Sequence, residues 1–345
     1  MTPVVSGVNA LMAAAIALIG VDGVIGLVDA RPPHRAAAAA IVLVQLVAAL
    51  TVAALLTRRA VSRSTVALSV YALSLVAVFG SRAAGGLVGW VSHRCSGGGA
   101  AFPDVFSRLL EGSAGAFVLA AVLAATYPSA ARLQPFWRES ALLRLSGCAF
   151  LAMLATQVAG NAYVKSGFGA EPWCHIATMQ ALPPGPAIMD SILAGFQEEF
   201  AFTGVAWALF ARARMRTQLG ALAINIVARL LPHLYYAQMD NVGRWALWIA
   251  IWSGGILVLG FVVMRIDLRK RASNTPIPAM VWAAMTGVVV AHSFWDLCGS
   301  EAGRLFVVSA IDVAGLAAIA VTIVVMLVRT LRWVVRRRRA NSAVE

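Results

Sequence analysis

Apolar segments long enough to cross a bilayer recur along the whole sequence, and they constrain the fold more than any other feature. The chain has 345 residues, of which 60% are hydrophobic and 12% are charged, whereas a soluble domain is typically about 25% charged. A transmembrane helix needs about 20 mostly apolar residues, so we predict an all-α polytopic membrane protein, a bundle of about ten transmembrane helices. The predicted spans are residues 8–28, 36–57, 65–88, 113–126, 142–159, 188–210, 219–236, 245–264, 279–297 and 305–328.

The basic residues indicate how these spans cross the membrane. The formal net charge is +13, but the cations form short clusters between apolar segments, which is typical of cytoplasmic loops and not of a nucleic-acid surface. Because every second loop is rich in Arg, both termini are predicted to be cytoplasmic. The cations of the rich loops and the tail are Arg58, Arg59, Arg63, Arg132, Arg138, Arg212, Arg214, Arg216, Arg265, Arg269, Lys270, Arg271, Arg332 and Arg336–Arg339.

The remaining loops are poorer in cations and are assigned to the opposite face. Arg82, near the end of the third predicted span, and Arg108, ahead of the fourth, fall in this group. The first apolar run has no basic segment before it and no clear cleavage site, so we interpret it as a span and not as a signal peptide. Ala, Val, Gly and Arg are abundant, which is typical of a GC-rich bacterial genome, and we expect the bacterial plasma membrane as the location.

Two cysteines fall in loops predicted to lie outside the cytoplasm. Cys95 and Cys174 would suit a disulfide there, because that face is oxidising. A second interpretation is a pair of unrelated free thiols. A third is a Cys₂His₂ zinc site, because His93 and His175 lie close to the two cysteines, although the spacing matches no standard zinc motif.

Ionisable residues inside the later spans are few and are concentrated in three of them. A charge at membrane depth is costly, so such residues indicate a function. A buried glutamate can act as general base on water, and histidine can stabilise the resulting oxyanion. Alternatively, Glu198, His233 and His292 could hold a catalytic divalent metal. The six residues are Glu198 and Glu199, then Arg229 and His233, then His292 and Asp296, the last two pairs each four positions apart and therefore on one helix face.

The order of these residues resembles the motifs of the CPBP family of intramembrane proteases, which includes CaaX prenyl endopeptidases and bacterial bacteriocin-processing or immunity-type proteins. Residues 198–204 (EEFAFTG) resemble the first motif, residues 230–234 (LLPHL) the second, and residues 292–296 (HSFWD) the third. The resemblance implies a CPBP-like protease core in the C-terminal half. It divides the chain into N-terminal transmembrane helices of unassigned role (1–186), the core (187–298), and a final transmembrane helix with a basic tail (299–345).

The resemblance also implies a role for each residue of the site. Glu198 would be the general base on water, and Glu199 would be its structural partner. His233 and His292 would position the water and stabilise the oxyanion, and Asp296 would orient His292. The implied substrate is a peptide or membrane protein at the lipid bilayer, and no nucleic-acid partner is expected. No cofactor is expected either, the alternative being the divalent metal held by Glu198, His233 and His292.

Two positions depart from the family pattern. Thr203 stands where the first motif normally has Arg, and Arg229 stands where the second normally has Phe. Thr203 lies four residues after Glu199, so its hydroxyl could reach that carboxylate. We hypothesise that Arg229 supplies the missing cation to Glu199 from the neighbouring helix.

Three functions are open on these residues. The first is an intramembrane endopeptidase that hydrolyses a peptide bond at or in the bilayer. The second is a catalytically degenerate CPBP-like protein that acts by binding a membrane partner in immunity or assembly, and Thr203 favours it. The third is a proton-coupled transporter that uses the buried carboxylates as a relay, although the two halves lack the matching Gly/Pro-broken helices expected of repeats.

Overall fold

The structure, a computed structural model, describes residues 3–30, 34–58, 63–91, 102–128, 140–167, 184–236, 242–270 and 277–299. Every element in these ranges is helical, which confirms the all-α prediction. The elements are α1 (Pro3–Asp29), α2 (Arg35–Thr57), α3 (Ser64–Val91), α4 (Phe102–Thr126), α5 (Ser140–Gly167), α7 (Pro184–Glu199), the π-helical η5 (Phe200–Gly204), α8 (Val205–Phe210), α9 (Met215–Leu230), the 3₁₀ segment η6 (Leu231–Tyr236), α10 (Val242–Ile249), the π-helical η7 (Ala250–Gly254), α11 (Gly255–Lys270) and α12 (Ile277–Gly299).

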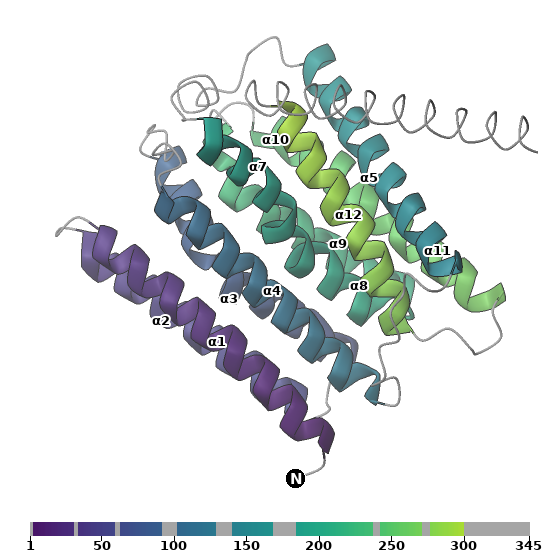
Figure 1. The fold of residues 1–345 in the computed structure, drawn as a ribbon, viewed down its shortest axis with the longest axis horizontal. Helices are drawn as coiled ribbons and strands as arrows, with labels where there is room; N and C mark the ends of the chain where they lie inside the picture. Colours follow the sequence, from purple (N-terminus) through teal and green to yellow (C-terminus); the bar gives the residue numbers. More distant parts are fainter. Residues whose placement is uncertain are drawn as a thin grey trace, which may run out of the picture.

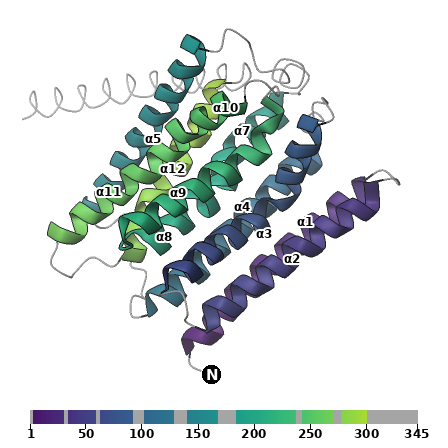
Figure 2. The ribbon, with the colours of Figure 1, turned by 180° about the vertical axis from the view of Figure 1, so that it is seen from behind.

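The helices lie side by side in one bundle (Figure 1). α1 and α2 form one edge, α5 and α11 lie toward the other, and α7, α8, α9 and α12 lie between them, as the reverse view also shows (Figure 2). Seven of the described helices are long and apolar enough to cross a membrane. Large apolar side chains on the outer helices are exposed, such as Val24 at 58% and Leu43 at 62%. Such a surface suits lipid tails, which are as apolar as the side chains themselves. The chain is an integral membrane protein.

The predicted number of about ten spans is not confirmed by the seven candidate spans. The shorter α9 and the α7–η5–α8 segment are not among the seven. The predicted last span, residues 305–328, and the basic tail lie outside the described residues, as do Cys95 and Cys174 of the predicted disulfide.

Three boundary predictions were wrong. The fourth helix begins at Phe102 and not near residue 113, and Arg108 lies inside it. Arg82 lies well inside α3, as the predicted span 65–88 implies, so its grouping with the loop cations was wrong. Both arginines pair with carboxylates inside the bundle, so they interrupt an apolar pattern without ending a helix. The predicted span 219–236 is α-helical only to Leu230, because Pro232 in the next segment has no N–H to continue the α-helical hydrogen bonds.

Close helix contacts at two glycines hold the central elements together. At Gly86 of α3, a Cβ atom would lie 2.2 Å from the carbonyl oxygen of Leu231, so only glycine lets η6 lie this close. At Gly195 of α7, a Cβ atom would lie 2.5 Å from the carbonyl oxygen of Val289 of α12. These two contacts position the segment that carries His233 and the helix that carries the two glutamates.

Candidate functional site

The two glutamates lie where the α-helix changes to a wider turn. Glu199 is the last residue of α7, and the π-helical η5 follows it directly. Such π-helical turns are rare and occur frequently at functional sites. The wider turn leaves the carbonyl oxygen of Phe202 to accept hydrogen bonds from Tyr71 Oη at 2.6 Å and from Asn225 Nδ2 at 3.0 Å. Ser253 Oγ in turn donates to Asn225 Oδ1 at 2.7 Å, so α3, α9 and the second π-helical segment η7 all fix this turn.

Arg229 of α9 joins the two carboxylates. Its Nη1 atom donates to Glu198 Oε2 and to Glu199 Oε1, both at 2.9 Å, and its Nη2 atom donates to Glu199 Oε2 at 3.2 Å. The guanidinium lies between the rings of Phe202 and Trp252, whose centroids are 4.3 and 4.6 Å from Cζ. The guanidinium of Arg229 thus lies beside Glu199, where the hypothesis places it, and its compensating role stays a prediction.

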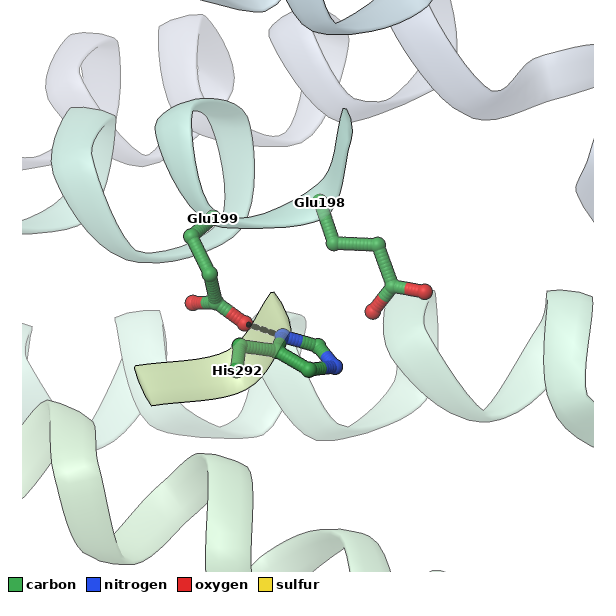
Figure 3. Close-up of side chains that lie close together, drawn as sticks. All are labelled: Glu198, Glu199 and His292. Atoms are coloured by element: carbon green, nitrogen blue, oxygen red, sulfur yellow. Dashed lines mark hydrogen bonds and ion pairs between the residues drawn. The ribbon is translucent and has the colours of Figure 1, made fainter. Parts of the chain in front are cut away.

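Glu199 is held on every side and is fully buried. Besides Arg229, its carboxylate accepts a hydrogen bond from Thr203 Oγ1 at 2.5 Å and one from His292 Nδ1 at 2.7 Å. Figure 3 shows the two glutamate side chains extending from α7 toward the ring of His292, with Glu199 bonded to it. Thr203 therefore contributes a hydroxyl to Glu199, as its spacing predicts.

Glu198 differs from Glu199 in having an uncommitted oxygen. Its Oε2 atom accepts from Arg229, whereas its Oε1 atom lies 3.7 Å from His233 Nε2 and has no hydrogen bond within the described part of the chain. The Glu198 side chain is 14% exposed and that of Glu199 is 0% exposed. A separation of 3.7 Å between two polar atoms suits a bridging water molecule.

The partners of the two histidines determine where their protons lie, because hydrogens are inferred from the groups they contact. His233 Nδ1 lies 2.7 Å from the carbonyl oxygen of Arg229. That oxygen only accepts, so Nδ1 carries the proton, and Nε2 of neutral His233 is an acceptor facing Glu198. His292 Nδ1 likewise donates to the carboxylate of Glu199, and its Nε2 lies 3.8 Å from Asp296 Oδ2. Carboxylates near both ring nitrogens favour the imidazolium form of His292.

Two buried N–H groups of the site lack a hydrogen-bond acceptor among the described residues. They are Nε of Arg229 and Nε1 of Trp252. Trp252 lies on η7, with its ring centroid 5.5 Å from that of His292. Buried donors in folded proteins are nearly always satisfied, often by ordered water. These two groups are therefore available to a water molecule or to a substrate carbonyl oxygen.

A metal could use three residues of the site. One ligand atom from each of Glu198, Glu199 and His292 lies within 4.8 Å of the others, whereas the sequence placed His233 in that set in place of Glu199. Both carboxylates already accept hydrogen bonds from Arg229, and His292 donates to Glu199. A divalent ion would have to displace these bonds and lie beside a guanidinium. The arrangement therefore favours the guanidinium as the cation of this site.

A second buried polar cluster lies on the other side of α7. Glu111 of α4 accepts hydrogen bonds from Arg82 Nε at 2.5 Å and from Gln197 Nε2. Arg108 Nη1 donates to Gln197 Oε1 at 2.8 Å, and Arg108 also pairs with Asp190. We call these five residues the Glu111 cluster, and we call Glu198, Glu199, Arg229, His233 and His292 the Arg229 cluster.

The structure brings together Glu198, Glu199, Thr203, Arg229, His233, His292 and Asp296 from α7, η5, α9, η6 and α12, whereas Cys95 and Cys174 lie outside the described residues. Sequence reasoning missed Trp252, Asn225 and Tyr71, which support or line the site. The Glu111 cluster was also missed, although Glu111 is a lone carboxylate in an otherwise apolar stretch and its cost at membrane depth is a usable signal.

Comparison with protein-family models, with curated proteins and with solved structures finds no match for this sequence. The arrangement of the site therefore carries the functional argument by itself.

Proposed function

We propose that the chain is an intramembrane endopeptidase of the CPBP type, in a bacterial plasma membrane with both termini cytoplasmic. One observation supports this most strongly. Of two adjacent glutamates, one is fixed by Arg229, Thr203 and His292, while the other keeps a free oxygen beside the acceptor nitrogen of His233. This asymmetry suits a structural carboxylate next to a general base.

The first step of the proposed reaction uses Glu198 and His233. A water molecule between Glu198 Oε1 and His233 Nε2 would donate one hydrogen to each, because both atoms are acceptors. Its oxygen lone pair is then directed away from both groups. As the water attacks the peptide carbonyl carbon, its proton passes to Glu198 and the carbonyl oxygen becomes an oxyanion.

The second step needs donors for the oxyanion and a proton for the leaving nitrogen. The unsatisfied N–H groups of Arg229 and Trp252, with the Nε2–H group of His292 as an imidazolium, are the donors this site offers. Glu198 then transfers its proton to the amide nitrogen, the C–N bond breaks, and a carboxylic acid and an amine are released, which leaves Glu198 ionised again. With Glu198, Glu199, Arg229 and His292 all ionised, the charges of the Arg229 cluster balance, which lowers the cost of burying them.

The main alternative is a protein of the same type that binds a membrane partner without cleaving it. Thr203 in place of the motif Arg favours that alternative, and Arg229 weakens it by providing a cation at the same carboxylate. Proton-coupled transport is a third possibility that uses the same buried carboxylates. It predicts proton-driven flux in proteoliposomes, which an endopeptidase does not produce.

Comparison of wild type with Glu198→Gln tests the proposal. Both proteins would be expressed in the same host, and new N- and C-terminal fragments of membrane proteins would be identified by mass spectrometry. Loss of a general base typically costs about 10²–10⁴-fold in rate, so fragments should appear with wild type and be nearly absent with Glu198→Gln.

A matched carboxylate away from the site provides the control. Asp29 is exposed at the end of α1, and Asp29→Asn should give the wild-type fragments. Equal amounts of folded protein would be checked by size exclusion in detergent. Identical fragment sets for wild type and Glu198→Gln, with both proteins folded, would refute catalysis and leave partner binding as the function.

A further inference from the structure

Most cations lie at one end of the bundle and most carboxylates at the other, although Arg35, Arg82, Arg108 and Arg244 also lie toward the carboxylate end. Arg265 on α11 donates to the carbonyl oxygen of Ala213 at 2.8 Å, which joins the end of α11 to the turn between α8 and α9. The cations at this arginine end, within the described residues, are Arg58, Arg63, Arg144, Arg212, Arg214, Arg216, Arg265, Arg269 and Lys270.

The opposite end, which we call the site end, holds most of the described carboxylates. Ser107 donates to Asp22 at 2.5 Å, which joins the last turns of α1 to the first turns of α4. The ion pairs of Glu111 with Arg82 and of Asp190 with Arg108 add α3 and α7 to the same end. By position in the described helices, the carboxylates toward this end are Asp22, Asp29, Asp104, Glu111, Asp190 and Asp296, Glu198 and Glu199 lie nearer the middle, and Asp267 lies at the arginine end.

His292 and Arg229 lie closer to the site end than to the arginine end, whereas Glu198 and Glu199 lie near the middle of the α7–η5–α8 segment. At a rise of 1.5 Å per residue, His292 is about 10 Å from the last residue of α12 and about 22 Å from its first. Arg229 is next to the last residue of α9, which begins at the arginine end. Exposure rises in the same direction, since the side chain of Glu199 is 0% exposed, that of His292 6% and that of Asp296 36%.

We propose that the Arg229 cluster opens toward the non-cytoplasmic face of the membrane. Cations between transmembrane helices are concentrated on the cytoplasmic side, and this bias sets the orientation of the whole bundle. The arginine end is therefore cytoplasmic, and the site end faces the opposite compartment. The identity of the substrate rests on the proposed function. The substrate is a membrane-anchored polypeptide, and it is cut in the segment where it leaves the bilayer on the non-cytoplasmic side.

Thiol labelling tests the orientation without any assay of activity. All four cysteines would be replaced by Ser, and single cysteines introduced at exposed helix ends, with Asp29→Cys and Gly299→Cys at the site end and Ser64→Cys and Met215→Cys at the arginine end. A membrane-impermeant maleimide would be applied to right-side-out vesicles. The site-end cysteines should be labelled there, and the arginine-end cysteines only in inverted vesicles or after detergent.

Every result decides one part of the proposal. The proposed orientation would be overturned if Ser64→Cys and Met215→Cys were labelled in right-side-out vesicles while Asp29→Cys and Gly299→Cys were not. If labelling agrees, the cut sites of the wild-type-specific fragments test the substrate. Cuts in cytoplasmic segments would overturn the substrate class, whereas labelling as expected with no fragments would overturn the endopeptidase function alone.

Discussion

The bundle contains two buried clusters in which carboxylates lie beside arginines, and they differ in how completely their hydrogen bonds are satisfied. In the Glu111 cluster, the carboxylate accepts from both Arg82 and Gln197, and no buried side-chain atom of the five described residues lacks a partner. In the Arg229 cluster, Oε1 of Glu198 and the buried Nε atom of Arg229 have no hydrogen-bond partner within the part of the chain that the structure describes, the former lying 3.7 Å from His233 Nε2.

This difference separates a structural role from a chemical one. A fully satisfied buried network rigidifies the fold, and the Glu111 cluster accordingly links α3, α4 and α7. A network with unused donors and acceptors keeps groups available for a ligand. The two clusters lie on neighbouring faces of α7, because Gln197 of the first directly precedes Glu198 of the second.

Removal of the arginine should affect the Arg229 cluster far more than the Glu111 cluster. Arg229→Met leaves two buried carboxylates without their cation, and breaking a buried pair in this way costs about 3–5 kcal/mol. Arg82→Met affects one carboxylate, that of Glu111, which still accepts a hydrogen bond from Gln197. Because the Arg82 side chain is already 31% exposed, the loss of stability should be about half as large. Unfolding of both variants in the same detergent measures the difference.

Arg229→Lys is the control for charge. It keeps the cation but not the fork that reaches both glutamates, so its stability should lie between those of wild type and Arg229→Met. Equal losses for Arg229→Met and Arg82→Met would show that the two clusters are energetically alike, and the distinction drawn between them would fail.

Gly86→Ala should disturb the site through the backbone. The added Cβ atom would lie 2.2 Å from the Leu231 carbonyl oxygen and would push η6, which carries His233, away from α3. Overpacking of this kind costs about 1–3 kcal/mol. The adjacent Gly85→Ala is a matched control, because a Cβ atom there meets nothing within 4 Å, and alanine is the better helix former.

For this pair, both the amount of fragments and the temperature of thermal unfolding are measured. Gly86→Ala should lower both quantities, and Gly85→Ala should lower neither. If Gly86→Ala retained full fragment production, the position of His233 would not matter for the reaction. That result would place His233 with the structural residues of the Glu111 cluster.

The sequence predicted the helical bundle and the members of the Arg229 cluster, because ionisable residues are conspicuous in apolar spans. It placed Arg82 and Arg108 in loops, because their partners are remote in the sequence, with Arg82 29 positions from Glu111. The π-helical turn after Glu199 was not predictable for the same reason. Its Phe202 carbonyl oxygen accepts a hydrogen bond from Tyr71, which is 131 positions away.

The smallest predicted effect concerns Thr203, and it tests whether the hydroxyl or the guanidinium of Arg229 contributes more to the stability of Glu199. Thr203→Val removes one hydrogen bond from Glu199 but leaves those from Arg229 and His292, so stability should fall by about 1 kcal/mol. A double-mutant cycle with Glu199→Gln isolates that bond, and a coupling of about 0.5–1.5 kcal/mol is expected. The Ser107–Asp22 bond, which is only partly buried, gives a matched cycle near the other cluster and should show weaker coupling. If Thr203→Val lost as much stability as Arg229→Met, the Thr203 hydroxyl would stabilise Glu199 as strongly as the guanidinium does. A loss near 1 kcal/mol would instead assign the charge compensation to Arg229.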